Sequence, residues 1–188
     1  MSYENPKKNE KTRIELFQQP DLYTYIDESH PMIQAAKEAA LKHSLTPTFP
    51  IGIVIEKNGE IISSTGNGNG YHEKNLETLE HKGGCKRRYI SQQLEDAGKP
   101  KLVSGEKFNL CPGCDPAAHA EARAITESTD PEKLDGATIY LYGHWWCCED
   151  CWDKLKKNGI SDVRLIEKFK DKSELHQWRD LFIEESKK

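Results

Sequence analysis

The sequence lacks the features that would place the chain in a membrane or send it out of the cell. No apolar run approaches the roughly 20 residues that a helix needs to span a bilayer. The first eight residues are polar and charged, without the apolar stretch of a secretory signal. Internal repeats and low-complexity tracts are also missing. We therefore expect a cytoplasmic protein without membrane contact.

The chain also lacks an excess of positive charge. It carries 27 lysines and arginines against 31 aspartates and glutamates, a formal net charge of −4. A surface that binds nucleic acid would favour a basic balance, so the charge argues against a nucleic-acid partner. A small anionic substrate is still compatible, because a few local cations are enough to hold one phosphate.

The length and the hydrophobic pattern predict one α/β domain. A chain of 188 residues is long enough for one such domain and too short for two comfortable ones. Asn58-Gly59 is a strong turn signal between two apolar runs and predicts an antiparallel hairpin. Strands that then alternate with helices predict a mainly parallel sheet. The expected strands cover residues 51–55, 60–64, 137–142 and 162–166, and the expected helices cover residues 31–43, 86–97, 117–127, 149–157 and 173–185.

The domain boundaries follow from the same pattern. Residues 1–30 begin with a polar stretch and are expected to form an N-terminal arm, whereas residues 31–188 form the single domain. Residues 66–116 are rich in irregular sequence and are expected to form an inserted loop region. A loop of that length inside a compact domain is usually functional or is held by specific contacts.

Six cysteines are the most informative part of the composition. In a cytosolic protein they are not expected to form a disulfide framework. Their spacing indicates metal binding instead, because Cys111 with Cys114 and Cys148 with Cys151 both form C-x-x-C pairs. Cys85 and Cys147 are the other two.

His119 and the pair Cys148 and Cys151 stand at the starts of two predicted helices. A catalytic zinc site has three protein ligands and an open fourth position for water. One imidazole and two thiolates supply the three, and residues at i and i+3 of a helix share a face. Glu121 is two positions from His119 and points differently, so it is available for proton transfer rather than for the metal.

Each of these motifs has a simpler interpretation on its own. A single histidine on a helix is usually structural, and one C-x-x-C pair, Cys111 with Cys114 above all, could be a redox pair. The four C-x-x-C cysteines could also form one closed structural site in a non-enzymatic zinc-binding module. That alternative needs neither His119 nor Glu121, and it leaves the glycine- and asparagine-rich residues 66–69 unexplained.

His119-x-Glu121 followed by Cys148-x-x-Cys151 resembles the signature of the zinc-dependent cytidine and deoxycytidylate deaminases. The residues around both motifs and the hairpin are also similar, so the resemblance covers residues 31–167. It implies the cytidine deaminase-like fold, a three-layer α/β/α sandwich with a central mixed sheet. It further implies Zn²⁺ held by His119, Cys148 and Cys151, with Glu121 as the catalytic acid and base, and a homo-oligomer.

Within that family the chain is most similar to the deoxycytidylate deaminases, through Gly84-Cys85-Lys86-Arg87 and the run-up over residues 106–119. The resemblance implies deamination of a cytosine nucleotide, with dCMP as the preferred substrate, to the uracil nucleotide and ammonia. Two alternatives remain open. One is a deaminase of a free nucleoside or base, and the other acts on a base in nucleic acid, such as adenosine in tRNA.

Several residues are candidates for substrate contact. Family members hold the base or sugar with an asparagine after the second hairpin strand. Here Asn69 is preferred, with Asn67 as the alternative. The basic cluster near residue 87 would bind a 5′-phosphate, or it would be a solvated face. The tryptophan pair would stack on a base, or it would make a packing or subunit contact. The remaining candidates are Ala120, Arg87, Arg88, Trp145 and Trp146.

Three departures from the family pattern concern the cysteines and the loop before them. Cys147 stands where the family usually has proline, and residues 143–147 form a connection about two residues longer than usual. The role of Cys147 is open. Some deoxycytidylate deaminases carry a second, structural zinc. The three remaining thiols, with His81 or alternatively His72, would form such a site: Cys85, Cys111 and Cys114.

Overall fold

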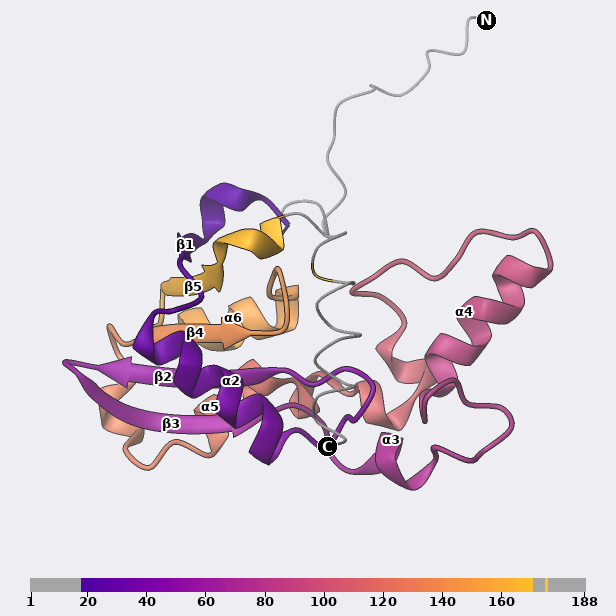
Figure 1. The fold of residues 1–188 in the computed structure, drawn as a ribbon, viewed down its shortest axis with the longest axis horizontal. Coiled ribbons are helices and arrows are strands. Elements are labelled where there is room, and N and C mark those ends of the chain that lie inside the picture. The colour runs from indigo at the N-terminus through magenta and orange to yellow at the C-terminus, as the bar shows by residue number, and fades with distance from the viewer. Residues whose placement is uncertain (1–17, 171–174, 176–188) are drawn as a thin grey trace, which may run out of the picture.

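The computed structural model describes residues 18–170 together with Leu175. Its strands form one mixed sheet in the order β1-β5-β4-β2-β3 (Figure 1). β1, β5 and β4 run parallel, whereas β2 is antiparallel to both β3 and β4. The predicted mixed sheet is therefore confirmed. The strands are β1 Thr24–Ile26, β2 Gly52–Lys57, β3 Glu60–Gly66, β4 Thr138–Tyr142 and β5 Asp162–Ile166.

The hairpin of β2 and β3 turns at the predicted Asn-Gly pair. Asn58 and Gly59 have φ angles of 53° and 86°. Positive φ at both central residues is what the tight two-residue hairpin turn requires, and asparagine and glycine tolerate it best. The pairing of β2 with β3 shifts once, between Ile55 and Glu56. Beyond this shift Val54 lies on one face of the sheet, and its neighbours Ile53 and Ile55 lie on the other.

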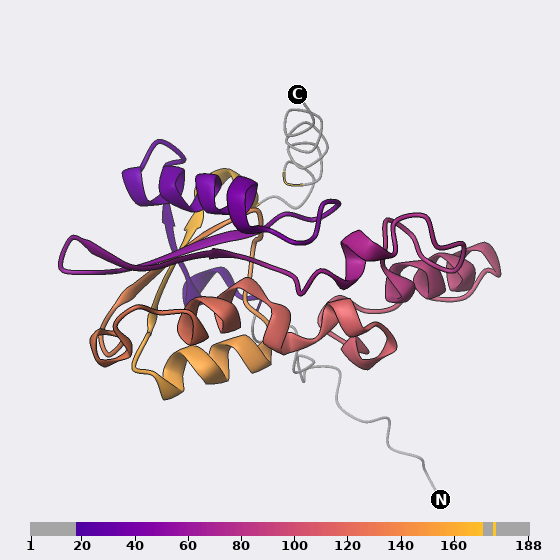
Figure 2. The same cartoon turned by 90° about the horizontal axis from the view of Figure 1, so that it is seen from below.

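Helices cover both faces of the sheet (Figure 2). α2 (Pro31–His43) packs on one face through a cluster that includes Ile33, Ala36 and Val54. α5 (Ala120–Thr126) and α6 (Glu149–Lys157) lie on the other. That second cluster contains Ile53, Ile55, Ile139, Leu141, Ala120, Ala124, Cys151 and Leu155. The predicted three-layer α/β/α sandwich is confirmed.

Residues 66–116 form a lobe that projects from one end of the sandwich (Figures 1 and 2). The lobe contains α3 (Tyr71–Lys74), α4 (Lys86–Asp96) and short 3-10 turns. α4 agrees with the helix expected there, yet it has no buried residue. Apolar packing therefore contributes little to holding α4, and other contacts must fix the lobe. The 3-10 turns of the lobe are η2 (Phe108–Leu110) and η3 (Pro112–Cys114), and η4 (Pro116–Ala118) leads from the lobe to α5.

The described part of the expected N-terminal arm differs from the expectation. A 3-10 turn, η1 (Pro20–Leu22), leads to Tyr23, which is buried, and β1 then adds a parallel edge strand to β5. A strand of three residues shows no alternation that would identify it in sequence. Residues 1–17 lie outside the described residues, as does the helix expected over 173–185 except for Leu175. Within the described ranges no helix is both long and apolar enough to cross a bilayer.

Candidate metal and substrate site

The starts of α5 and α6 bring three predicted metal ligands together. His119 is the N-cap residue of α5, Cys148 is the N-cap residue of α6, and Cys151 lies in the first turn of α6. The Sγ atoms of Cys148 and Cys151 are each 3.4 Å from His119 Nδ1. All three ligand atoms lie within 4.8 Å of one another. One imidazole and two thiols fit a zinc site with one open position.

The surroundings of Cys148 favour its thiolate form. Its hydrogen bonds with Cys151 and His119 lower its pKa to about 5, although burial opposes the shift. The N-terminus of α6 adds a favourable dipole for a negative charge at this position. A thiolate is the form of cysteine that binds metal, so this shift favours metal binding by Cys148.

Glu121 lies in the first turn of α5 and is buried, with 6% of its surface exposed. Burial raises its pKa above that of an ordinary glutamate, and the neighbouring Cys148 thiolate raises it further. A carboxyl group with a raised pKa takes up a proton more readily than an ordinary carboxylate, which suits a group that carries protons. Glu121 is not among the three grouped ligand atoms, which agrees with a role in proton transfer.

Cys147 contacts this glutamate rather than a metal group. Its thiol is fully buried and hydrogen-bonds to Glu121, and burial together with that carboxylate raises the pKa of the thiol. Among the described residues, neither group of metal-ligand atoms includes Cys147. The residue that replaces the usual proline is thus part of the packing around the carboxylate.

A cavity of about 640 Å³ opens beside the three ligands. His119, Ala120, Glu121 and Cys148 lie in its wall, so the metal group and the carboxylate face the same space. A cavity of this size suits a small organic ligand. The lobe supplies part of the wall, and the other predicted contacts found there are Asn67, Arg87, Arg88, Trp145 and Trp146.

The two candidate asparagines are placed differently relative to the cavity. β3 ends at Gly66, so Asn67 is the first residue beyond it, and Asn67 lines the cavity. Its Oδ1 accepts hydrogen bonds from Ile51 N and Ser44 Oγ. Asn69 is exposed, is absent from the cavity wall, and donates from Nδ2 to Pro112 O at 2.9 Å.

The two arginines of α4 have different partners. Arg87 donates from Nε to Glu106 O at 2.7 Å and from Nη2 to Val103 O at 2.6 Å. Arg88 is exposed and donates from Nη1 to Thr48 Oγ1 at 3.1 Å. Both side chains line the cavity, but Arg87 is the one whose guanidinium is engaged with the backbone of the lobe.

Phe108 is a site residue that the sequence reasoning missed. Its ring meets the His119 ring edge-on, with centroids 4.9 Å apart and planes at 81°, and it lines the cavity. The Arg87 guanidinium also lies over the Phe108 ring, 5.6 Å from its centroid. A lone phenylalanine in an irregular stretch carries no signal of this contact in the sequence.

A second group of metal-ligand atoms lies in the lobe and joins His72, Cys85, Cys111 and Cys114. The Cys85 and Cys114 Sγ atoms are 3.5 Å apart, and Cys111 Sγ is 3.5 Å from His72 Nε2. The ligand atoms of all four residues lie within 4.8 Å of one another. Three thiols and an imidazole make a complete tetrahedral donor set, as in closed structural zinc sites.

His72, and not His81, is therefore the histidine of this group. Glycine brings the backbone close to it, since a Cβ on Gly113 would lie 2.4 Å from the His72 ring and a Cβ on Gly84 would lie 1.9 Å from His72 O. His81 Nε2 lies instead 3.2 Å from the Tyr71 hydroxyl. Spacing alone did not separate the two histidines, because the close approach depends on the fold of the lobe.

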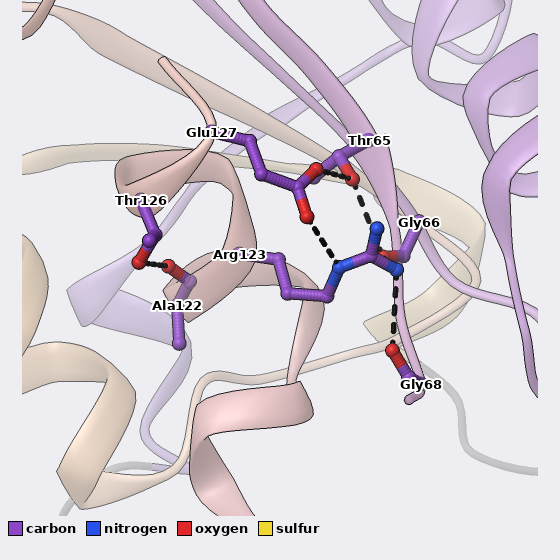
Figure 3. Close-up of polar contacts among 7 residues, drawn as sticks. All are labelled: Thr65, Gly66, Gly68, Ala122, Arg123, Thr126 and Glu127. Carbon is purple, nitrogen blue, oxygen red and sulfur yellow. Dashed lines mark hydrogen bonds and ion pairs between the residues drawn. The ribbon is translucent and has the colours of Figure 1, made fainter. Parts of the chain in front are cut away.

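A polar network ties the end of β3 to α5 (Figure 3). Arg123 donates from Nη1 to the carbonyls of Gly66 and Gly68, at 2.7 and 3.2 Å, and pairs with Glu127 at 2.8 Å. Glu127 in turn accepts from Thr65 Oγ1 at 2.6 Å. The carbonyls that Arg123 binds flank Asn67, so the helix that carries Glu121 also holds the asparagine of the cavity wall.

Comparison with known proteins agrees with this geometry. The family model described as the cytidine and deoxycytidylate deaminase zinc-binding region matches residues 27–167, which include all three ligands and Glu121. No curated protein matches the chain significantly. The chain belongs to the cytidine and deoxycytidylate deaminase family of zinc-dependent hydrolases, and Zn²⁺ is its cofactor.

Proposed function

We propose that the chain deaminates a cytosine nucleotide, with dCMP as the preferred substrate, and that it releases the uracil nucleotide and ammonia. The observation that carries the proposal is the meeting of His119, Cys148 and Cys151 within 4.8 Å beside buried Glu121, in the wall of one cavity. Family membership supports the zinc-dependent deaminase chemistry, and the choice of dCMP is our own extension.

Each side chain near the ligands has a role in the proposed reaction. Zinc held by His119, Cys148 and Cys151 would supply the acidity that makes water a usable nucleophile at neutral pH. Glu121 takes a proton from that water as its oxygen adds to C4, and passes a proton to ring nitrogen N3. Glu121 would then take the remaining proton from the C4 hydroxyl and give it to the amine, so that C4=O forms as the C4–N bond breaks and ammonia leaves.

The rest of the cavity supports a nucleotide rather than a bare base. Arg88 is the better phosphate ligand of the two arginines, because Arg87 already donates to two carbonyls of the lobe. Asn67 would hold the base or the sugar, and Ala120 would contact the base. Trp145 and Trp146 would provide the flat wall against which the ring packs.

The four ligand atoms of the lobe would hold a second, structural zinc. A closed set of three thiols and one imidazole leaves no position for a substrate. α4 buries no residue of its own, so a metal that joins residues 72, 85, 111 and 114 would supply the missing tie between α4 and the cavity wall. A homo-oligomer and a cytoplasmic location stay predictions.

The experiment is a measurement of ammonia release by the zinc-loaded chain over a panel of substrates. The panel contains cytosine, cytidine, deoxycytidine and their mono- and triphosphates, with an adenosine-containing tRNA stem-loop alongside. The highest kcat/KM is expected for dCMP. A higher kcat/KM for deoxycytidine than for dCMP would indicate that the substrate is a free nucleoside. Activity on the stem-loop alone would indicate that the substrate is a base in nucleic acid.

A further inference from the structure

Tyr23 lies outside the part of the chain that marks the family and inside the segment expected to be an arm. It directly precedes β1 and is four residues before the start of the matched region at residue 27. Only 7% of its surface is exposed. Its ring packs against Trp152 with centroids 5.8 Å apart. The N-terminal segment thus reaches the same face of the sheet as the metal ligands.

The Tyr23 hydroxyl touches both flanks of the C-x-x-C ligand pair. It accepts a hydrogen bond from the backbone N–H of Cys147 at 2.9 Å, and Cys147 directly precedes the ligand Cys148. It also accepts one from Trp152 Nε1 at 3.2 Å, and Trp152 directly follows the ligand Cys151. One oxygen atom therefore joins the residue before the first thiol to the residue after the second.

Both donors to this oxygen are removed from water. Cys147 is fully buried and Trp152 is 4% exposed. If a buried N–H loses its acceptor, its desolvation penalty is no longer offset by a hydrogen bond. The backbone would then have to shift to bring the N–H to another acceptor. Burial also raises the pKa of Tyr23 well above its ordinary range, so the hydroxyl is neutral at physiological pH. The Tyr23 hydroxyl therefore does not change its charge over the physiological pH range.

The backbone that Tyr23 holds positions more than one group of the site. It sets where Cys148 enters α6, and hence where both Sγ atoms lie relative to His119 Nδ1. It also carries the Cys147 thiol, which hydrogen-bonds to Glu121. Outer partners that orient ligands in this way typically change metal affinity or activity by 10- to 100-fold when they are removed.

We propose that Tyr23 is a positioning residue of the zinc site, which orients the Cys148 and Cys151 thiolates and, through Cys147, the Glu121 carboxylate. It acts through these residues and does not itself touch the substrate. The part of this inference that concerns turnover rests on the proposed function, whereas the part that concerns ligand geometry does not.

The test compares Tyr23→Phe with Tyr25→Phe in the 188-residue chain. Both changes remove one hydroxyl and keep the ring, and Tyr25 lies two residues further on in β1, where it pairs with Leu165 of β5 and contacts the Tyr23 ring. The metal probe is Co²⁺, whose absorption reports thiolate ligation, and it is titrated in a background with Cys111→Ser and Cys114→Ser, so that the band reports Cys148 and Cys151 rather than the group in the lobe. Tyr23→Phe should weaken Co²⁺ binding, measured by chelator competition, by about 10-fold and alter the thiolate band. It should also lower kcat by about 10-fold with KM within about twofold, and Tyr25→Phe should match the wild type.

The outcomes separate this inference from the proposed function. Wild-type Co²⁺ affinity, band shape and kcat in Tyr23→Phe would overturn the inference while leaving the deaminase intact. A wild-type chain with a thiolate–Co²⁺ band and no turnover would overturn the proposed function alone, and the band and affinity of Tyr23→Phe would still decide the inference. If Tyr23→Phe does not fold, 3-fluorotyrosine at position 23 keeps both hydrogen bonds but weakens the acceptor. It should then weaken Co²⁺ binding in the same direction, and no change would overturn the inference.

Discussion

Arg88 and Arg87 are neighbours on α4 that differ in their hydrogen-bond partners and in their exposure. Arg88→Met should raise KM for dCMP by on the order of 10- to 100-fold, because a charge-assisted hydrogen bond to phosphate is lost. The turnover of deoxycytidine should not change. Steady-state kinetics with both substrates measures the difference, which should shrink at high salt because Arg88 is exposed.

Lys86→Met is the matched control, since Lys86 is an exposed cation of the same helix that does not line the cavity. An equal loss for both substrates in Arg88→Met would show that the residue supports the cavity wall rather than the phosphate.

Asn67 and Asn69 make a second matched pair. Asn67→Asp keeps the Oδ1 acceptor for Ile51 N and Ser44 Oγ but removes both amide N–H donors, one of which bonds Phe49 O at 2.9 Å and the other of which is the donor left for substrate. We expect kcat/KM for dCMP to fall by about 10-fold in Asn67→Asp, the loss of roughly one hydrogen bond. Asn69→Asp should stay within about twofold in the same assay. The reverse order would restore the assignment that the sequence favoured.

At the residue scale, the sequence predicts those site residues that belong to motifs of fixed spacing. His119, Glu121, Cys148 and Cys151 follow from two short motifs whose residue types suit one metal and one proton carrier. The choice between Asn67 and Asn69 depended on where β3 ends, and one strand residue more or less changes which side chain meets the cavity. Tyr23 and Phe108 act through contacts made only after folding, so no local pattern marks them.

At the scale of elements, α5 is tied to the end of β3 by Arg123 (Figure 3). Arg123→Met removes a charged donor from the buried carbonyls of Gly66 and Gly68. We expect the free energy of unfolding to fall by about 1–3 kcal/mol, as measured by urea denaturation. Arg164→Met is the control, since Arg164 pairs with Asp162 on β5, next to the edge strand β1 on the side of the sheet opposite to β3. Equal losses in both variants would argue against a special role for the β3–α5 tie.

The lobe offers a prediction of its own. Cys111→Ser with Cys114→Ser should lower the zinc content by one ion per chain, measured by elemental analysis, because two of four ligands are lost. Proteolysis within residues 66–116 should become faster, since α4 has little apolar packing to hold it. The Cys147→Ser protein is the control, because Cys147 belongs to neither group of ligand atoms among the described residues. Unchanged zinc content in the double variant would exclude a metal in the lobe.

Elements with strong local signals were predictable, and short ones were not. The hairpin followed from Asn58-Gly59, and α4 and α6 followed from their composition. β1 has three residues and exists because β5 offers an unpaired parallel edge, which is a property of the assembled sheet. The lobe was expected as a loop region, but its closure around His72 needed the close approach of Gly84 and Gly113.

At the scale of the whole molecule, the strand order brings the two halves of the metal site together. α5 precedes β4 and α6 follows it, and both cover the same face of the sheet (Figure 2). The starts of both helices therefore meet, although His119 and Cys151 are 32 residues apart in the chain. The alternation of strands and helices predicted this class of fold, whereas the cavity wall contributed by the lobe required the three-dimensional arrangement.

The most direct test of the account separates metal binding from turnover in one variant. Glu121→Gln keeps the shape of the side chain and removes its capacity to carry a proton, and Glu121 lies outside the group of ligand atoms. Zinc content and ammonia release from dCMP are measured on the same preparation, next to the wild type. The account predicts full zinc content and a loss of kcat of at least about 100-fold, the usual range for a general acid–base. Turnover near the wild-type rate in Glu121→Gln would contradict it.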